Sequence, residues 1–359
     1  MDDGRSTPPL VAIACQGGGS HAAFGAGVID RLLEDHGRRF RLAALSGTSG
    51  GAVNAVLAWS GLIQGGPGGG PAEARRRLRG MWEDLGASDL PDALRNWAGQ
   101  VLLGLPFTWE LSPYVLDLGA REELVDRLRR WARLEDMPSD PARLNDPYLL
   151  VGATDILNGV SVAIRGDGEA MTRPRQKVRL RREPFGYADV VASAAIPPLY
   201  RDVERRGTAF WDGLFSINPP VNALTNLKPR PEEIWVVQIN PQRAGRAPRD
   251  IRGIADRRNE LGGNISLNKE LDTIEAVNEM LGKGLLAGGD YRPIAARIVG
   301  LEEPEAGLDL TYASKFDRSP PFLRRLFDLG RERAPAFYGP DSLRDQVSRR
   351  RARSPLPAG

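Results

Sequence analysis

The segment of this chain best suited to chemistry is Gly47-Thr48-Ser49-Gly50-Gly51. A Gly-x-Ser-x-Gly turn between an apolar strand and a helix exposes a nucleophilic serine in many hydrolases, and a histidine further along the chain usually activates it. The only two histidines here, His21 and His36, both precede Ser49. Either Ser49 uses a different base, or it is a serine that caps a helix at a glycine-rich turn.

A second glycine-rich segment, Gly17-Gly18-Gly19, follows an apolar stretch and precedes a helical pattern. Successive glycines can direct backbone N–H groups at one point and so form an anion site or an oxyanion hole. The spacing Gly17-x-Gly19-x-x-Ala22 also matches a dinucleotide-binding fingerprint. That function needs an acidic residue at the end of the second strand. The second apolar stretch instead ends in Leu45-Ser46-Gly47, which disfavours dinucleotide binding.

A carboxylate that acts directly on the serine is the economical alternative to histidine. The best candidate is Asp212, which follows an apolar stretch and precedes Gly213, where the backbone can turn tightly. The competing interpretation is an ordinary Asp-Gly hairpin turn.

The elements that position these residues begin with an alternation of strand and helix. Apolar runs predict strands at Leu10–Ala14 and Phe40–Leu45, and helical spacing predicts helices at Ala22–Glu34 and Ala52–Ile63. This order implies parallel strands joined by right-handed crossovers, and therefore an α/β fold. Further strands are expected at Pro147–Ala153, Ser161–Ile164, Lys177–Leu180, Leu199–Val203, Thr208–Trp211, Ile234–Ile239 and Ile294–Val299. Further helices are expected at Ala72–Leu85, Arg121–Trp131, Tyr187–Ala195, Ile265–Leu285 and Pro321–Ala336.

The domain organisation follows from breaks in these patterns. Gly65–Pro71 predicts a flexible break, and residues 64–145 read as a helical insertion or cap within a domain of residues 9–338. Within it, the aromatic-rich stretch Val101–Leu118 either lines an acyl pocket, touches a membrane or packs as core under the cap. Residues 1–8 and the basic segment 339–359 are expected to be disordered.

Composition limits the class of protein. The 359 residues are 41% hydrophobic and 26% charged, as in soluble globular proteins, and carry a formal net charge of +3. Nothing resembles a basic patch with interleaved aromatics, so nucleic-acid binding is not expected. The single cysteine, the polar N-terminus and the lack of a long apolar run favour the cytoplasm. Few metal-binding side chains are available, so no metal or organic cofactor is expected.

Taken together, five motifs in order resemble the patatin-like phospholipases across roughly residues 10–240. These are Gly17-Gly18-Gly19, Gly47-Thr48-Ser49-Gly50-Gly51, Gly152-Ala153-Thr154-Asp155, Ala192-Ser193 before Pro197-Pro198, and Asp212-Gly213 followed by Asn218-Pro219-Pro220. The resemblance implies a three-layer α/β/α fold with a mainly parallel central sheet. It also implies a Ser–Asp dyad without histidine, which accounts for the small histidine count.

By this resemblance Ser49 is the nucleophile and Asp212 is its base, and the N–H groups of the three glycines at 17–19 form the oxyanion hole. Gly47, Gly51 and Gly213 support the motifs, and Asp155 and Asn218 are expected to be structural supports. The implied substrates are lipid esters, of the phospholipase A or lysophospholipase type, met in peripheral contact with a membrane. A non-catalytic or activator-dependent lipid-binding protein on the same fold is the alternative.

The chain departs from the family pattern after Asp212-Gly213, where Leu214 stands in place of a second glycine or alanine, and in the glycine loop. The family commonly has Gly-Gly-Gly-x-Arg-Gly, whereas His21 and Ala22 occupy the last two positions here. A histidine is less reliably charged near neutral pH than an arginine. Any role that the arginine has elsewhere is therefore in doubt at His21.

Overall fold

A mixed sheet forms the centre of the protein in a computed structural model that describes residues 7–87, 120–172, 178–197, 200–286, 291–302, 308 and 310–343. Its strand order in these residues is β5-β4-β3-β2-β1-β8-β9, with β7 also paired to β3, and β6 to β7. The pairs β3–β2, β2–β1, β1–β8 and β8–β9 are parallel, and the others are antiparallel. The strands are β1 (Leu10–Cys15), β2 (Arg41–Thr48), β3 (Tyr148–Asp155), β4 (Val160–Arg165), β5 (Ala170–Thr172), β6 (Val203–Arg205), β7 (Thr208–Asp212), β8 (Glu233–Gln238) and β9 (Ala295–Gly300).

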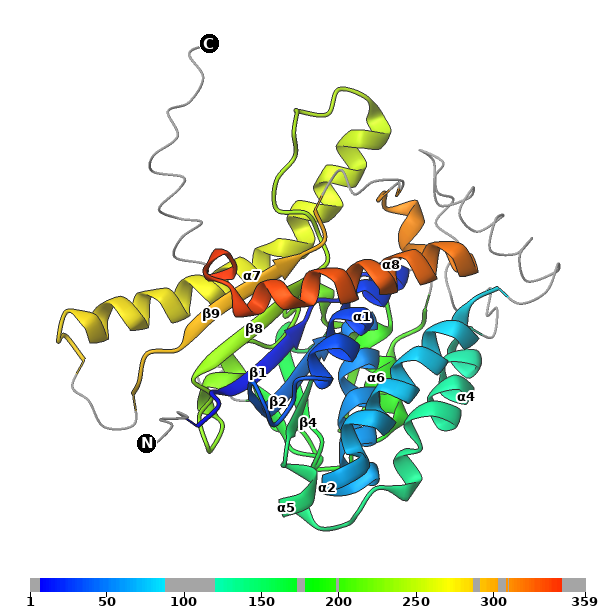
Figure 1. Cartoon of the computed structure of the whole chain (residues 1–359). Helices are drawn as coiled ribbons and strands as arrows, with labels where there is room; N and C mark the ends of the chain where they lie inside the picture. Colours follow the sequence, from blue (N-terminus) through cyan, green and yellow to red (C-terminus); the bar gives the residue numbers. More distant parts are fainter. Residues whose placement is uncertain are drawn as a thin grey trace.

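Helices cover both faces of this sheet and make a three-layer α/β/α structure (Figure 1). On one face lie α1 (Ala22–Leu33), α2 (Gly50–Leu85) and α8 (Pro320–Arg333), which share a buried apolar cluster with β1, β2 and β8. On the other face, α7 (Ile251–Gly282) packs its buried leucines against the opposite side chains of the same strands. The helices α4 (Ala120–Ala132) and α6 (Tyr187–Ala194) pack beside α2, near the β3–β4 edge. The predicted fold class is confirmed.

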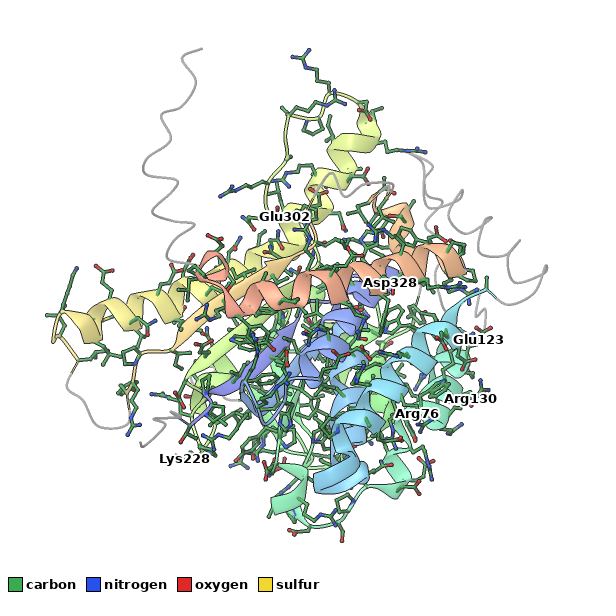
Figure 2. The ribbon with its side chains drawn as sticks, viewed as in Figure 1. Arg76, Glu123, Arg130, Lys228, Glu302 and Asp328 are labelled. Atoms are coloured by element: carbon green, nitrogen blue, oxygen red, sulfur yellow. The ribbon has the colours of Figure 1, made fainter. Side chains whose placement is uncertain are left out.

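The glycine- and proline-rich run is a tight reversal inside α2 and not the expected flexible break. Gly66 has φ 67° and ψ −174°, and beyond it the second half of α2 folds back along the first. A Cβ atom at Gly61 would lie 2.4 Å from the Cα of Ala74. The two halves of α2 can therefore pack this closely only because residue 61 is a glycine. Arg77, on the returning half, donates to Ser60 Oγ at 3.1 Å. Figure 2 labels Arg76, on this returning half of α2, and Arg130 of α4; the two helices that carry them pack against each other.

Three further expectations differ from the structure. Residues 178–180 form no strand, and the edge beside β4 is occupied by β5, which follows in a short hairpin. The strand expected at Leu199–Val203 appears as β6, from Val203. The helix expected from Ile265 begins at Ile251, because the carboxylate of Asp250 caps it by accepting the N–H of Gly253 at 2.9 Å.

Several domain expectations concern residues outside the described ones. These include Val101–Leu118 and the arginines of the terminal segment from Arg344 onward. At the start of that segment, the 3₁₀ turn η7 (Pro340–Ser342) is followed by a bridge between Leu343 and Arg297 of β9. None of the described helices is long and apolar enough to span a bilayer.

Strand register brings the motif residues to one edge of the sheet. In β1 and β2, Cys15 pairs with Gly47, so the glycine loop and the Ser49 turn leave neighbouring strands side by side. In β2 and β3, Thr48 pairs with Gly152, and in β3 and β7, Ala153 pairs with Asp212. The last residue of β7 therefore lies beside the turn that carries Ser49.

Candidate active site

Ser49 occupies the sharp turn between β2 and α2. It is a non-glycine residue with φ 55° and ψ −127°, and it stands directly before the first residue of α2. Such strain is maintained only where the surroundings impose it. A Cβ atom at Gly47 would lie 2.2 Å from Gly51 O, and one at Gly51 would lie 2.2 Å from Cys15 O. The two glycines therefore allow the turn to pack against β1, and the half-buried serine is presented at the positive end of a helix.

Asp212 ends β7 and is 1% exposed. One carboxylate oxygen accepts the N–H of Leu214 at 2.8 Å, and the Ser49 hydroxyl lies near enough to the carboxylate to lower its pKa. Burial raises the pKa of Asp212 to about 7, against the lowering effect of these two groups. A carboxylate with a pKa near neutrality is well matched to accept and return a proton.

Gly213 allows the chain to pass close to β3 immediately after Asp212. A Cβ atom there would lie 2.6 Å from Gly152 O and 2.8 Å from the methyl group of Thr48. The side chain of Thr154 donates to the carbonyl oxygen of Asp212 at 2.9 Å. These contacts hold the aspartate against the Ser49 turn.

Ser193, at the end of α6, forms hydrogen bonds that link the Ser49 turn to β3. Its hydroxyl accepts the N–H of Ser49 at 3.0 Å and donates to Gly152 O at 2.6 Å. The motif Ala192-Ser193 contributed to the family resemblance, yet no role was assigned to this serine from the sequence. A hydrogen bond to the N–H of Ser49 depends on how α6 packs against β3, which the motif alone does not show.

The glycine loop lies directly against the serine. A Cβ atom at Gly17 would lie 2.7 Å from the Cβ of Ser49, so only glycine allows this approach. The N–H of Gly17 is donated to Asn218 Oδ1 at 2.7 Å. Within the described residues, no acceptor is recorded for the N–H groups of Gly18 and Gly19. Two of the three expected oxyanion donors are therefore unengaged, and the third is used to hold the loop.

The two supports expected from the sequence have clear contacts. Asn218 is fully buried and fixes the glycine loop through Gly17. Asp155 accepts the N–H groups of Leu157 and Asn158 at 3.1 Å and the hydroxyl of Thr208 at 2.7 Å. It stabilises the β3–β4 turn and its neighbour β7, and so acts on the site only through the scaffold.

A segment near the C-terminus packs against the glycine loop. His21 Nε2 is hydrogen-bonded to Ser314 Oγ at 2.8 Å, and burial together with the charge of Lys315 keeps the pKa of His21 well below 6.5. A Cβ atom at Gly19, where φ is +56°, would lie 2.2 Å from Lys315 O. The imidazole that replaces the family's usual arginine is thus neutral.

Lys315 places a cation in this region. Its ammonium group donates to Asn240 Oδ1 at 2.6 Å and to Asn259 Oδ1, and burial lowers its pKa to about 8. No sequence motif indicated this residue, which is nearly 300 positions beyond the loop that it contacts. Only the tertiary packing of the turn η5 (Ala313–Phe316) brings it there.

His36 and Cys15 are not suited to act as a base or nucleophile at this site. His36 lies just before the start of β2, so roughly 25–30 Å of extended strand separates it from Ser49. Burial raises the pKa of Cys15 to about 12, which keeps it a neutral thiol. Among the described residues, no group of three or more histidine, cysteine or acidic side chains could hold a metal ion.

Comparison with known proteins identifies the family of this chain. A family model described as patatin-like phospholipase matches residues 13–225, from within β1 to the 3₁₀ turn η4 (Asn222–Asn226). No curated protein matches the chain significantly. Among solved structures, VipD from Legionella pneumophila aligns at a TM-score of 0.40 and 14% identity, over 92% of this chain and 67% of that one. The family match spans more than half of the chain and contains Ser49, Asp212 and the glycine loop, so this protein belongs to the patatin-like phospholipase family.

Proposed function

We propose that this protein is a serine acyl hydrolase that cleaves carboxylic ester bonds of lipids through Ser49 and Asp212. The observation that carries the proposal is that buried Asp212 ends β7 beside the turn that carries Ser49, near enough for the serine hydroxyl to lower the pKa of its carboxyl. Membership of the family supports a lipid as substrate at the level of class. The positions of both residues, each at the end of a strand at the same edge of the sheet, support a joint role.

In the first half of the reaction, the Ser49 oxygen attacks the ester carbonyl carbon while its proton passes to Asp212. The carbonyl π bond opens to an oxyanion, which accepts hydrogen bonds from the N–H groups of Gly18 and Gly19. Collapse of this intermediate breaks the bond to the leaving alcohol, which takes the proton from Asp212. An acyl group remains on Ser49.

In the second half, a water molecule attacks the acyl-enzyme while Asp212 accepts one of its protons. The second tetrahedral intermediate collapses to release the fatty acid, and the proton returns to Ser49. Ionised Asp212 is therefore required at the start of each half. A pKa of about 7 leaves a large fraction of the enzyme in this form at neutral pH while still allowing the carboxyl to return its proton.

The oxyanion hole in this proposal has two backbone donors of the glycine loop, not three. The N–H of Gly17 is already satisfied by Asn218, which keeps the loop in place beside Ser49. Preorganised donors of this kind contribute about 10²–10³ each to the rate, because they need no reorganisation during the reaction.

The test is hydrolysis of p-nitrophenyl esters of increasing acyl length, and of phospholipid vesicles, by the wild type and by Ser49→Ala and Asp212→Asn. We expect activity in the wild type and its loss in both variants. The matched controls Ser139→Ala and Asp328→Asn remove the same groups at exposed positions and should keep full activity. Activity that survives in Ser49→Ala would refute the mechanism, and a folded wild type inert on every ester would favour a non-catalytic lipid-binding protein.

A further inference from the structure

The first half of α7 stands clear of the sheet that the rest of the helix covers. We call residues 243–265, which comprise the preceding loop and this half of the helix, the α7 overhang. None of residues 251–259 is buried, and burial of the helix begins at Glu260. Figure 1 shows this part of α7 rising away from the layers of the fold. Figure 2 shows nitrogen-tipped side chains that point outward from it.

The overhang exposes an apolar stripe. Ile251, Ile254, Leu261 and Ile265 are 72%, 44%, 46% and 56% exposed. At 3.6 residues per turn these four side chains fall within about a quarter of the helix circumference. The buried face of α7, which includes Leu267 and Leu271, is on the opposite side. A helix that packs on a sheet by one face normally presents polar residues on the other, so this second apolar face needs a partner.

Positive charge surrounds the stripe. Residues 243–260 contain six arginines and three carboxylates. The carboxylates have partners within the fold: Asp250 caps α7, Asp256 accepts the N–H of Tyr312 at 2.8 Å, and Glu260 pairs with Arg257 at 2.7 Å. The other five arginines are exposed and are Arg243, Arg246, Arg249, Arg252 and Arg258. An apolar stripe among arginines is the composition of helices that lie at the surface of anionic membranes.

The overhang is continuous with the candidate active site. Gln16, which directly precedes the glycine loop, donates to Gly263 O at 2.9 Å and to Asn264 Oδ1 at 3.0 Å. Asn218, which holds that loop, donates its N–H to Ser266 Oγ at 3.1 Å. The stripe therefore ends where α7 is bonded to the scaffold of the oxyanion hole.

We propose that the α7 overhang docks on a membrane surface rich in anionic lipids. The four apolar side chains enter the interface, and the exposed arginines bind the headgroup phosphates. This inference rests on the proposed function, because a lipid hydrolase meets its substrate in an aggregate and gains when it is held at the surface of that aggregate. The arginines are spread along a convex loop and helix, which fits a continuous layer of mobile phosphates better than a single folded protein partner.

The test is co-sedimentation of the full chain, carrying Ser49→Ala so that no lipid is consumed, with vesicles of phosphatidylcholine alone or mixed with phosphatidylglycerol. One variant removes the stripe (Ile251→Ser with Ile254→Ser), and a second removes charge (Arg249→Gln with Arg252→Gln). Matched controls outside α7 are Leu157→Ser with Leu285→Ser, and Arg324→Gln with Arg325→Gln. The same substitutions in the chain with Ser49 intact are assayed on a short soluble ester.

We expect the parent chain to bind the anionic vesicles, each overhang variant to bind them at least tenfold more weakly, and both controls to bind like the parent. Hydrolysis of the soluble ester should be unchanged in all of them. Unchanged vesicle binding in both overhang variants would overturn the inference. So would binding only to a second copy of the chain, seen as a dimer in sedimentation that the stripe variant abolishes. Vesicle binding through the overhang by a chain inert on every ester would remove the proposed hydrolysis but leave the docking surface.

Discussion

Replacing Asp212 by asparagine is expected to stabilise the protein at neutral and alkaline pH while it abolishes hydrolysis. The pKa of the folded-state carboxyl is raised from 3.8 to about 7 by burial. For a group whose folded pKa is raised, the contribution to stability is complete below the unfolded pKa and is lost as the pH rises through the folded one. Wild-type Asp212 therefore becomes a destabilising group between about pH 4 and pH 7.

The magnitude follows from the two pKa values. Between about pH 5 and pH 7 the carboxyl is ionised in the unfolded chain and mostly protonated in the folded one, which costs about 1.4 kcal/mol per pH unit. The free energy of unfolding of Asp212→Asn, relative to the wild type, should thus rise by about 3 kcal/mol between about pH 5 and pH 8. Asparagine preserves the local contacts, because its oxygen can accept the N–H of Leu214 and its amide can donate to Ser49.

The assay is urea denaturation of both proteins at about pH 5 and pH 8, followed by circular dichroism. Asp328→Asn, at an exposed position of α8, controls for the loss of one carboxylate. Its stability difference from the wild type should be nearly the same at both pH values. If the difference for Asp212→Asn is also independent of pH, the argument that burial holds this carboxyl protonated is refuted.

Three further predictions concern the site. The kcat/KM for a soluble ester should rise with pH and level off above an inflection near 7, because Asp212 must be ionised; a profile flat from about pH 5 to 9 would contradict this. Ser193→Ala removes the acceptor for the Ser49 N–H, so kcat should fall about tenfold, the equivalent of one hydrogen bond, with KM little changed in steady-state kinetics. Gly19→Ala places a Cβ atom 2.2 Å from Lys315 O at positive φ, so activity should fall at least 10²-fold or soluble folded protein should be lost, as measured by ester hydrolysis and circular dichroism.

Local sequence patterns predicted the elements that carry the site because they involve neighbouring residues. The strand, turn and helix around Ser49 were expected near the observed positions, since apolar periodicity and glycine placement are local properties. Predictions from these patterns were wrong where contacts between residues distant in the sequence determine the local structure. Gly65–Pro71 read as flexible, yet the returning half of α2 packs against the first half and makes it a tight turn. The strand expected at 177–180 does not form in residues 178–180 because β5 occupies the edge of β4.

The local sequence made Asp212 the best candidate base for Ser49, and the family resemblance then assigned the two residues as a dyad, although nothing in the local sequence joins residues so far apart. The register of β2, β3 and β7 supplies the physical connection. The expected role of Gly17 as an oxyanion donor conflicts with its hydrogen bond to Asn218, because the amide N–H has one proton to donate. A glycine motif identifies a flexible loop but does not indicate which of its N–H groups are already bonded.

The sequence by itself determined the fold class, the Gly-x-Ser-x-Gly turn, the glycine loop and the fact that no histidine follows Ser49. Only the tertiary structure decided the properties that make these residues a site. The raised pKa of Asp212 comes from complete burial by several strands, and the neutral state of His21 comes from burial and the nearby Lys315. Solvent exclusion and charge proximity depend on every element that surrounds a group, so no local pattern can encode them.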